Sequence, residues 1–207
     1  VDKKGYTPLM WGAYGGNLDA VKALLEKGAD LQVKDKDGYK ALDHARDGKY
    51  KDRIEPIVEF LIDRQKFIDE GSDKAGVVSS EPQAESVAEE SREEFPLCVG
   101  AYPEKDFDIE LFEAIKENED KKINEQLEKG MENCLDDDGR TLLIYASVLG
   151  NIELVKHLID NGAQVNIESK KKRTALMLAA YGGHEEVVNE LLKHGARPKI
   201  NDQNYRG

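Results

Sequence analysis

The chain has 207 residues, and its 42 acidic against 30 basic residues give a formal net charge of −12 at pH 7. Binding to nucleic-acid phosphates requires clustered Lys and Arg, so this balance argues against a nucleic-acid partner. No apolar run is long enough to span a bilayer, and none at the N-terminus resembles a signal peptide. We therefore expect a cytoplasmic or nuclear protein without a membrane contact.

The first predicted unit covers residues 2–34 and consists of a turn followed by two helices. Thr7-Pro8 predicts the start of a helix, because Thr is a common N-cap and Pro is well tolerated at the first helical position. Apolar residues at helical spacing in 18–25 predict a second helix. Gly28 would supply the left-handed residue that follows it.

The same pattern returns further along the chain, where Gly5-Tyr6-Thr7-Pro8-Leu9 is matched by Gly38-Tyr39-Lys40-Ala41-Leu42. We call the spacing from Gly5 to Gly38 one repeat length, and residues 1–67 are predicted to hold two units. Pro56 predicts that the second helix of the second unit begins close to it and runs through 57–62. No Gly-Ala-Asp closes this unit, and a diverged, polar unit is typical of the end of a repeat array.

Residues 68–106 have a different character. From residue 69 onward they contain eleven acidic and three basic residues, with almost no periodic apolar positions. This composition predicts a disordered acidic linker. Ser86 and Ser91 each have Glu three residues on, a context that acidophilic kinases favour.

Residues 107–207 form a second group. Residues 107–135 have no leading turn but carry apolar residues at helical spacing, which predicts an N-terminal cap; these are Leu111, Ile115, Ile123 and Leu127. Residues 136–168 and 169–201 are well-formed units, since Thr141-Leu142-Leu143 returns one repeat length later as Thr174-Ala175-Leu176.

A turn and two short helices, repeated at a spacing of about 33 residues, resemble the ankyrin-repeat family. Its specific matches are Gly-Tyr-Thr-Pro-Leu (5–9), Leu-Leu-Glu-Lys-Gly-Ala-Asp (24–30), Asn-Gly-Ala-Gln-Val-Asn (161–166) and Leu-Ala-Ala-Tyr-Gly-Gly-His (178–184). The resemblance covers all but the acidic linker, and implies an all-α solenoid of about five helix–turn–helix units with short β-hairpin-like turns. The usual His after Thr-Pro-Leu is replaced here by Met10, Ile144 and Met177.

The order of the units is unusual, because the first group begins without a cap and the second ends without one. Placing 107–207 before 1–67 gives cap, repeat, repeat, repeat, cap. We therefore hypothesise that the N-terminal pair docks onto the end of the second group. Two incomplete arrays, or a piece of a longer protein, are the alternatives. We expect a monomer, with domain-swapped or head-to-tail assembly left open.

In the ankyrin-repeat family, partners usually meet the turn tips and the exposed side of the first helices. The resemblance implies these partner-binding residues: Lys3, Lys4, Tyr6, Tyr14, Lys36, Tyr39, Arg140, Val148, Leu149, Lys170, Lys171, Arg173 and Tyr181. The dense basic run 170–173 could meet an acidic peptide, a phosphate group or the acidic linker. Trp11 takes the place of a framework Leu, so we expect it in the core.

No catalytic, cofactor-binding or metal site is predicted. The sequence has no phosphate-cradling Gly loop and no nucleophile elbow, and Cys98 and Cys134 lack metal-ligand spacing. We therefore expect a non-catalytic scaffold or adaptor that binds a protein partner of unspecified identity. The alternatives are an assembly chaperone for a basic client protein, and a regulatory fragment of a larger enzyme or channel.

Overall fold

The computed structural model describes residues 1–48, 50–69 and 138–198, together with residues 115, 123, 133, 135 and 136. The predictions for residues 70–106, including Ser86, Ser91 and Cys98, and those for Leu111, Leu127 and Cys134, lie outside the described residues. The regular structure of the described part is all-α, as predicted. Its eight helices are α1 (Pro8–Tyr14), α2 (Leu18–Glu26), α3 (Ala41–Arg46), α4 (Lys51–Asp69), α7 (Leu142–Leu149), α8 (Ile152–Asp160), α9 (Ala175–Gly182) and α10 (Glu185–Lys193).

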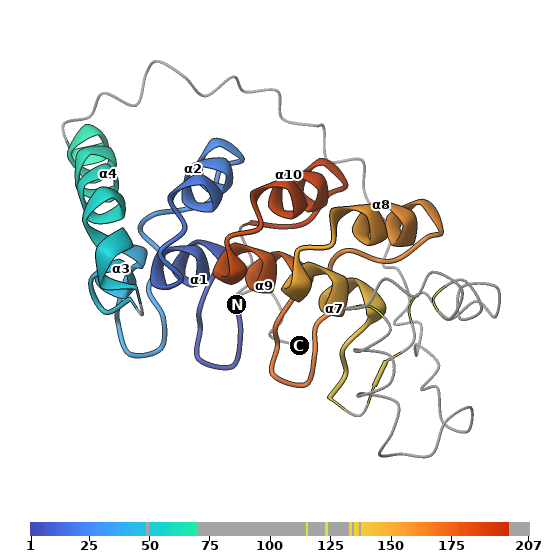
Figure 1. Ribbon diagram of the computed structural model, residues 1–207. Coiled ribbons are helices and arrows are strands. Elements are labelled where there is room, and N and C mark those ends of the chain that lie inside the picture. The colour runs from blue at the N-terminus through green and yellow to red at the C-terminus, as the bar shows by residue number, and fades with distance from the viewer. Residues whose placement is uncertain are drawn as a thin grey trace, which may run out of the picture.

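The helices form two rows, with the turns projecting on one side (Figure 1). In the first row α7 contacts α9, α9 contacts α1, and α1 contacts α3. In the second row the contacts run in the same order, from α8 through α10 and α2 to α4. The N-terminal helices therefore follow the C-terminal ones in space, although they precede them in the chain.

Threonine side chains cap three of the four first-row helices. The Oγ1 atoms of Thr7, Thr141 and Thr174 accept the N–H three residues on, at 3.2, 3.3 and 3.4 Å. In the remaining helix Lys40 offers no such oxygen, and Asp43 Oδ2 instead accepts the Lys40 N–H at 2.9 Å. The predicted N-cap at Thr7 is confirmed, and the loss of Thr in the last unit is offset by a carboxylate in the first turn.

The start of α4 differs from the prediction. We expected this helix to begin close to Pro56, but it begins at Lys51 and includes Pro56 in its interior. Proline removes the backbone bond to the carbonyl four residues earlier, that of Asp52. Both Pro56 and Asp52 are exposed, so water can reach this carbonyl. The helix also continues to Asp69, two residues into the predicted linker.

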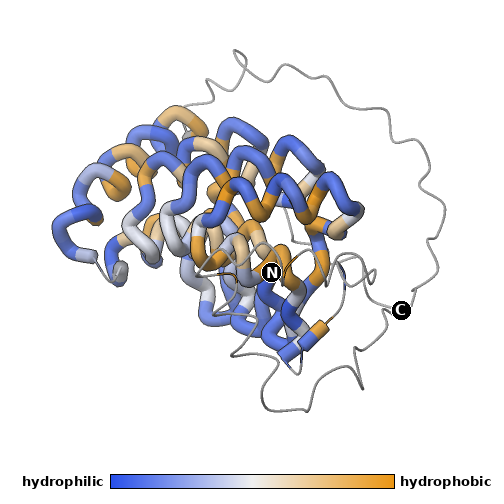
Figure 2. Tube along the Cα trace, turned by 45° about the vertical axis from the view of Figure 1, so that its right-hand side comes forward, coloured by the Kyte–Doolittle hydropathy of each residue, from blue (hydrophilic) through white to orange (hydrophobic). Residues whose placement is uncertain are grey.

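The apolar core lies between the two rows and passes through every unit. One buried cluster extends from Ile115 and Ile123, through α7–α10 and α1–α2, to Ile57 and Leu61 of α4. Ile115 and Ile123 are helical and at most 3% exposed, as their spacing predicts. Apolar positions recur along the helices, whereas the turn tips are hydrophilic (Figure 2). Stacking therefore shelters faces that a single helical hairpin would expose to water.

The two halves of the chain meet where α1 and α2 pack against α9 and α10, and we call this contact the junction. The helices there are aligned as they are between two units that are consecutive in the chain. Between consecutive units, His184 Nε2 lies 2.9 Å from the carbonyl oxygen of Val148 at the end of α7. At the junction, Asn17 Nδ2 donates to the carbonyls of Ala180 and Tyr181 at the end of α9, at 2.8 and 2.7 Å. In both places the residue that precedes a second-row helix binds the end of the neighbouring first-row helix.

Replacing Asn17 tests this junction. Asn17→Ala removes both hydrogen bonds to α9, and we expect it to lower the free energy of unfolding by about 1–3 kcal/mol. The measurement is urea unfolding of the intact chain, followed by far-UV circular dichroism. Asn189→Ala, on the exposed side of α10, is the control and should change stability by less than about 0.5 kcal/mol. Equal effects of the two substitutions would contradict the assigned role of Asn17.

Candidate protein-binding surface

Four turns of one geometry project from the first-row helices, and they cover residues 136–140, 169–173, 2–6 and 35–39. In each turn the N–H of the first residue donates to the carbonyl of the fifth, at 2.9–3.0 Å. A buried side-chain oxygen of the first residue also accepts the N–H of the fifth, at 2.7–3.2 Å; these residues are Asp136, Ser169, Asp2 and Asp35. A buried acceptor therefore fixes the shape of every turn from below.

Adjacent turns are joined by backbone hydrogen bonds. The Lys170 N–H donates to the Asp138 carbonyl at 2.8 Å, and the Lys36 N–H donates to the Lys4 carbonyl at 3.1 Å. The same bond crosses the junction, where the Lys3 N–H donates to the Lys171 carbonyl at 3.2 Å. The four turns therefore form one continuous edge.

The fourth residue of each turn has a left-handed backbone. It is glycine in three turns, at Gly5, Gly38 and Gly139, but Lys172 in the remaining one, with φ of 60°. A Cβ built on Gly5 would lie 2.9 Å from the backbone nitrogen of Lys36 in the next turn, so glycine there also permits the close approach of turns. Lys172 adopts the same conformation without the freedom that glycine has.

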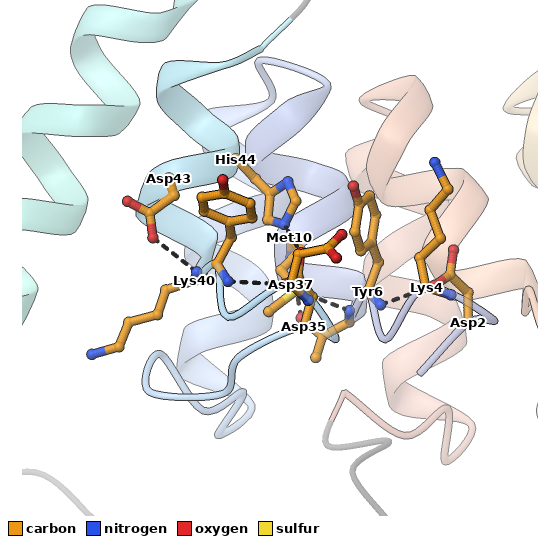
Figure 3. A network of polar contacts seen from close by, with 11 residues as sticks. Asp2, Lys4, Tyr6, Met10, Asp35, Asp37, Lys40, Asp43 and His44 are labelled. Carbon is orange, nitrogen blue, oxygen red and sulfur yellow. Dashed lines mark hydrogen bonds and ion pairs between the residues drawn. The ribbon is translucent and has the colours of Figure 1, made fainter.

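Two turn aspartates are also held by a side chain from the helix that follows. His44 Nε2 lies 2.8 Å from Asp35 Oδ2, and the Tyr145 hydroxyl donates to Asp136 Oδ2 at 2.5 Å. Figure 3 shows His44 above the turn that Asp35 organises. Burial alone would raise the pKa of Asp35, but hydrogen bonds from the Tyr39 N–H, His44 and the Asp37 N–H together lower it. Burial, and then the bond to Asp136, raise the pKa of Tyr145, so its hydroxyl stays protonated and donates.

An aromatic stripe runs along the turn side of the first-row helices. Ring centroids lie 6.2 Å apart for Tyr14 and Tyr181, 5.4 Å for Tyr181 and Trp11, and 5.7 Å for Trp11 and Tyr6. The stripe continues from Tyr6 to His44, whose ring centroids are 4.3 Å apart, and from His44 to Tyr39, whose centroids are 6.3 Å apart. We define the aromatic stripe as these six residues, which come from three neighbouring units: Tyr39, His44, Tyr6, Trp11, Tyr181 and Tyr14.

A pocket of about 240 Å³ lies beside the stripe, between α7, α9 and the turns that precede them. We call it the α7–α9 pocket, and its charged and apolar walls are Asp138, Arg140, Lys171, Arg173, Val148 and Leu178. Arg173 links it to the stripe, because its guanidinium carbon lies 4.8 Å from the centre of the Trp11 ring. Two buried donors lie where the pocket meets the stripe, Arg173 Nε and Trp11 Nε1. Neither has a hydrogen-bond partner among the described residues.

The predicted partner-binding residues all lie at turns or on first-row helices. Four surround the α7–α9 pocket: Arg140, Val148, Lys171 and Arg173. Four belong to the aromatic stripe: Tyr6, Tyr14, Tyr39 and Tyr181. Four are exposed lysines in the turns: Lys3, Lys4, Lys36 and Lys170. Leu149 is placed differently, since it is half-buried and packs against the core.

Four residues at or directly beneath this surface were not predicted as contacts: Trp11 and Leu178, which are half-buried, and His44 and Tyr145, which are buried. We expected Trp11 in the core, but it is half-buried on the surface between Tyr6, Tyr181 and Arg173. The sequence contains a signal that could have found them. Trp11 and His44 are one repeat length apart, as are Tyr145 and Leu178. They therefore share one position of the repeat, the position that faces the turn.

Within the described part of the chain, no group of three or more His, Cys, Asp or Glu side chains could hold a metal ion. Among the same residues, no helix is both long and apolar enough to cross a membrane.

A family model described as ankyrin repeats, in three copies, matches residues 1–72 and 111–202. The chain belongs to the ankyrin-repeat family. Ankyrin repeats are generic protein–protein interaction modules, and their fold is a non-catalytic interaction fold. In this ankyrin-repeat protein, the exposed side of the first-row helices and the turns together form what we call the first-helix surface.

Relatives match short segments of this ankyrin-repeat chain. The Notch-regulated ankyrin repeat-containing protein of Homo sapiens is 37% identical over 68 residues, which are 33% of this chain and 56% of that protein. The E3 ubiquitin-protein ligase Ufd4 of Drosophila melanogaster is 39% identical over 59 residues, 28% of this chain and 2% of the ligase. The chain thus spans about half the length of the Notch-regulated relative and a very small part of the ligase.

A solved structure is also similar. It is described as the Bd0816 predatory endopeptidase from Bdellovibrio bacteriovorus in complex with immunity protein Bd3460. The similar chain is 27% identical, and the match covers 93% of this ankyrin-repeat protein and 82% of that chain. The TM-score is 0.38, so the two superpose only loosely.

The buried carboxylate of Asp35 gives a prediction about pH. We expect Asp35→Asn to lower the free energy of unfolding by about 1–3 kcal/mol at neutral pH, because it weakens the bonds to His44 and the turn. The pKa of Asp35 in the folded state lies below its ordinary value of 3.8. Its contribution is therefore complete above about pH 3.8, and is lost as the pH falls through the lower folded-state pKa.

The test compares urea unfolding of the two proteins between about pH 2 and pH 7. The difference between their unfolding free energies should shrink as the pH falls below about 3.8. Asp37→Asn, an exposed change in the same turn, is the matched control. A difference that stays constant down to the acid limit would show that the charge of Asp35 contributes nothing.

The left-handed residue Lys172 gives a second prediction. Lys172→Gly relieves a backbone strain of about 1–2 kcal/mol, partly offset by the greater freedom of glycine in the unfolded chain. We expect a net stabilisation of about 0.5–1 kcal/mol, which corresponds to a rise in Tm of roughly 1–4 °C. Thermal unfolding measures it. Lys171→Gly is the control, since its φ is not positive, and it should lower Tm or leave it unchanged.

Proposed function

We propose that this ankyrin-repeat protein is a non-catalytic interaction module that binds a protein partner through its first-helix surface. The observation that carries the proposal is the aromatic stripe, which crosses three units. Its most exposed residue is Tyr39, which is 55% accessible. Tyr and Trp combine large contact area with a polar group and little side-chain entropy, and they are enriched among residues that dominate binding energy.

The unpaired donors support the same surface. A buried donor without an acceptor costs about 1–3 kcal/mol, and both Trp11 Nε1 and Arg173 Nε are of this kind within the described part of the chain. They lie next to one another, since the Arg173 guanidinium covers the Trp11 ring. A partner that supplies an acceptor here would recover this cost on binding.

The charge of the first-helix surface favours an acidic partner. Seven of the thirteen predicted contact residues are basic, on a chain whose net charge is −12: Lys3, Lys4, Lys36, Arg140, Lys170, Lys171 and Arg173. Electrostatic complementarity chiefly sets the association rate and selects among partners. A basic client would meet like charge at the turn tips, so the chaperone alternative is less well supported.

A second candidate is the same binding role inside a larger enzyme or channel. It is favoured by the match to Ufd4, an E3 ubiquitin-protein ligase of which the similar segment makes up 2%. A repeat array in this position would select the protein on which the larger enzyme acts. A complete gene that encodes a catalytic domain next to these repeats would support this candidate.

Site-specific photo-crosslinking in cells tests the main proposal. A photoreactive amino acid is placed at Val148 or Tyr181 on the first-helix surface, and at the exposed positions Lys156 and Asn189 on the second row as controls. We expect discrete crosslinked protein adducts from the first two positions only. Adducts confined to the second-row positions, or equal at all four, would reject the first-helix surface as the binding site.

A further inference from the structure

We propose that the α7–α9 pocket receives a carboxylate side chain, Glu or Asp, beside an aliphatic residue in a segment of the partner protein. This inference rests on the proposed function and names the chemistry that the first-helix surface recognises. The pocket is formed by two consecutive units, within residues 138–178.

The charges of the pocket call for an anion. Three cations line it, and only Arg140 has an ion-pair partner among the described residues, with its guanidinium 2.5 Å from Asp138 Oδ2. Lys171 and Arg173 have no carboxylate partner in the same part of the chain. After Asp138 is counted, the pocket carries an excess of two positive charges on a protein that is acidic overall. An anionic group of a partner would therefore be attracted to this pocket in particular.

The hydrogen-bonding capacity points to an acceptor. Arg173 Nε is buried and has no partner among the residues that the structure describes, so one donor of its guanidinium is already removed from water without an acceptor. The side chain is also held in place, because it packs over the Trp11 ring. A carboxylate accepts from a guanidinium through two oxygens, and an Arg whose position is fixed in advance loses little entropy when it binds.

Size and apolar walls indicate what carries the carboxylate. At about 240 Å³ the pocket is smaller than most small-molecule sites, which occupy roughly 300–1,000 Å³. Val148, 38% exposed, and Leu178 supply an apolar wall that suits aliphatic groups. The volume is therefore suited to one or two side chains of a protein segment rather than to a metabolite.

The apolar wall favours a carboxylate side chain over phosphate. Phosphate carries nearly twice the negative charge of a carboxylate at neutral pH, so it is attracted more strongly by Lys171 and Arg173 and also repelled more strongly by Asp138. Phosphate has no apolar atoms, however, whereas the methylene groups of Glu or Asp can contact Leu178.

Peptide selection on the intact chain tests this inference without knowledge of the partner. Random displayed peptides of about twelve residues are selected on the protein, with counter-selection on a Lys171→Gln/Arg173→Gln variant. We expect enrichment of Glu or Asp next to Leu, Ile, Val or Met. A synthetic peptide of the enriched sequence should bind about 10-fold or more weakly when its acid is changed to Gln, because a charge-assisted hydrogen bond is lost.

The matched protein variants are Arg173→Gln and Arg64→Gln. Arg173→Gln should weaken the selected peptide by about 10-fold or more, whereas Arg64→Gln, an exposed and equal change of charge on α4, should change binding less than about 2-fold. Since Arg173→Gln could also destabilise the repeat, thermal unfolding is measured beside binding. The Glu→Gln change in the peptide leaves the protein unchanged, so it tests recognition of the carboxylate independently of the stability of the repeat.

Several outcomes would overturn the inference. They are the failure to enrich any acidic sequence, equal binding of the acid and amide peptides, and displacement of the peptide by about 10 mM inorganic phosphate, which would indicate a general anion site. Selected peptides that lack an acid but lose binding on Tyr181→Ala would refute the pocket and leave the proposed function standing. Peptides whose binding is unchanged by substitution of Tyr181, Arg173 or Lys171 would refute both the pocket inference and the proposed function.

Discussion

The buried oxygen at the base of each turn is the interaction on which the binding surface depends. Asp2, Asp35, Asp136 and Ser169 sit below the turn tips and accept backbone N–H groups from them. Without this acceptor, one or two N–H groups of each turn would lose their side-chain partner. With it, four exposed segments adopt one shape and join edge to edge through backbone bonds. The turns are thus held in one shape before a partner binds, which reduces the entropy lost on binding.

The fold was largely predictable because the repeat imposes it. The constant repeat length, the Thr caps and the apolar spacing predicted seven of the helices that the structure describes close to their observed positions. The prediction for α4 was wrong at its start, because proline was treated as a fixed helix boundary. An interior proline costs a helix about 3 kcal/mol, but the packing of α4 against α2 and α3 and the hydration of the freed Asp52 carbonyl offset this cost.

The candidate surface was predicted less completely. The repeat identified which turns and helices face outward, and so placed Arg140, Lys171, Arg173 and the tyrosines. It did not identify Trp11, because this residue was compared with the family pattern rather than with its counterparts in the other units, His44 and Tyr145. The α7–α9 pocket arises from side chains of two units meeting in space. Such meetings depend on side-chain directions, which a one-dimensional pattern does not contain.

The junction at Asn17 has a consequence for how the chain reaches its folded state. In most solenoids each unit touches only its neighbours in sequence, so order spreads along the chain from any starting point. Here α1 packs on α9, and residues more than 160 positions apart form hydrogen bonds. The middle of the stack therefore joins segments that lie far apart in the chain, so its completion must wait for a large loop to close. Such non-local pairing slows folding far more than it weakens the final structure.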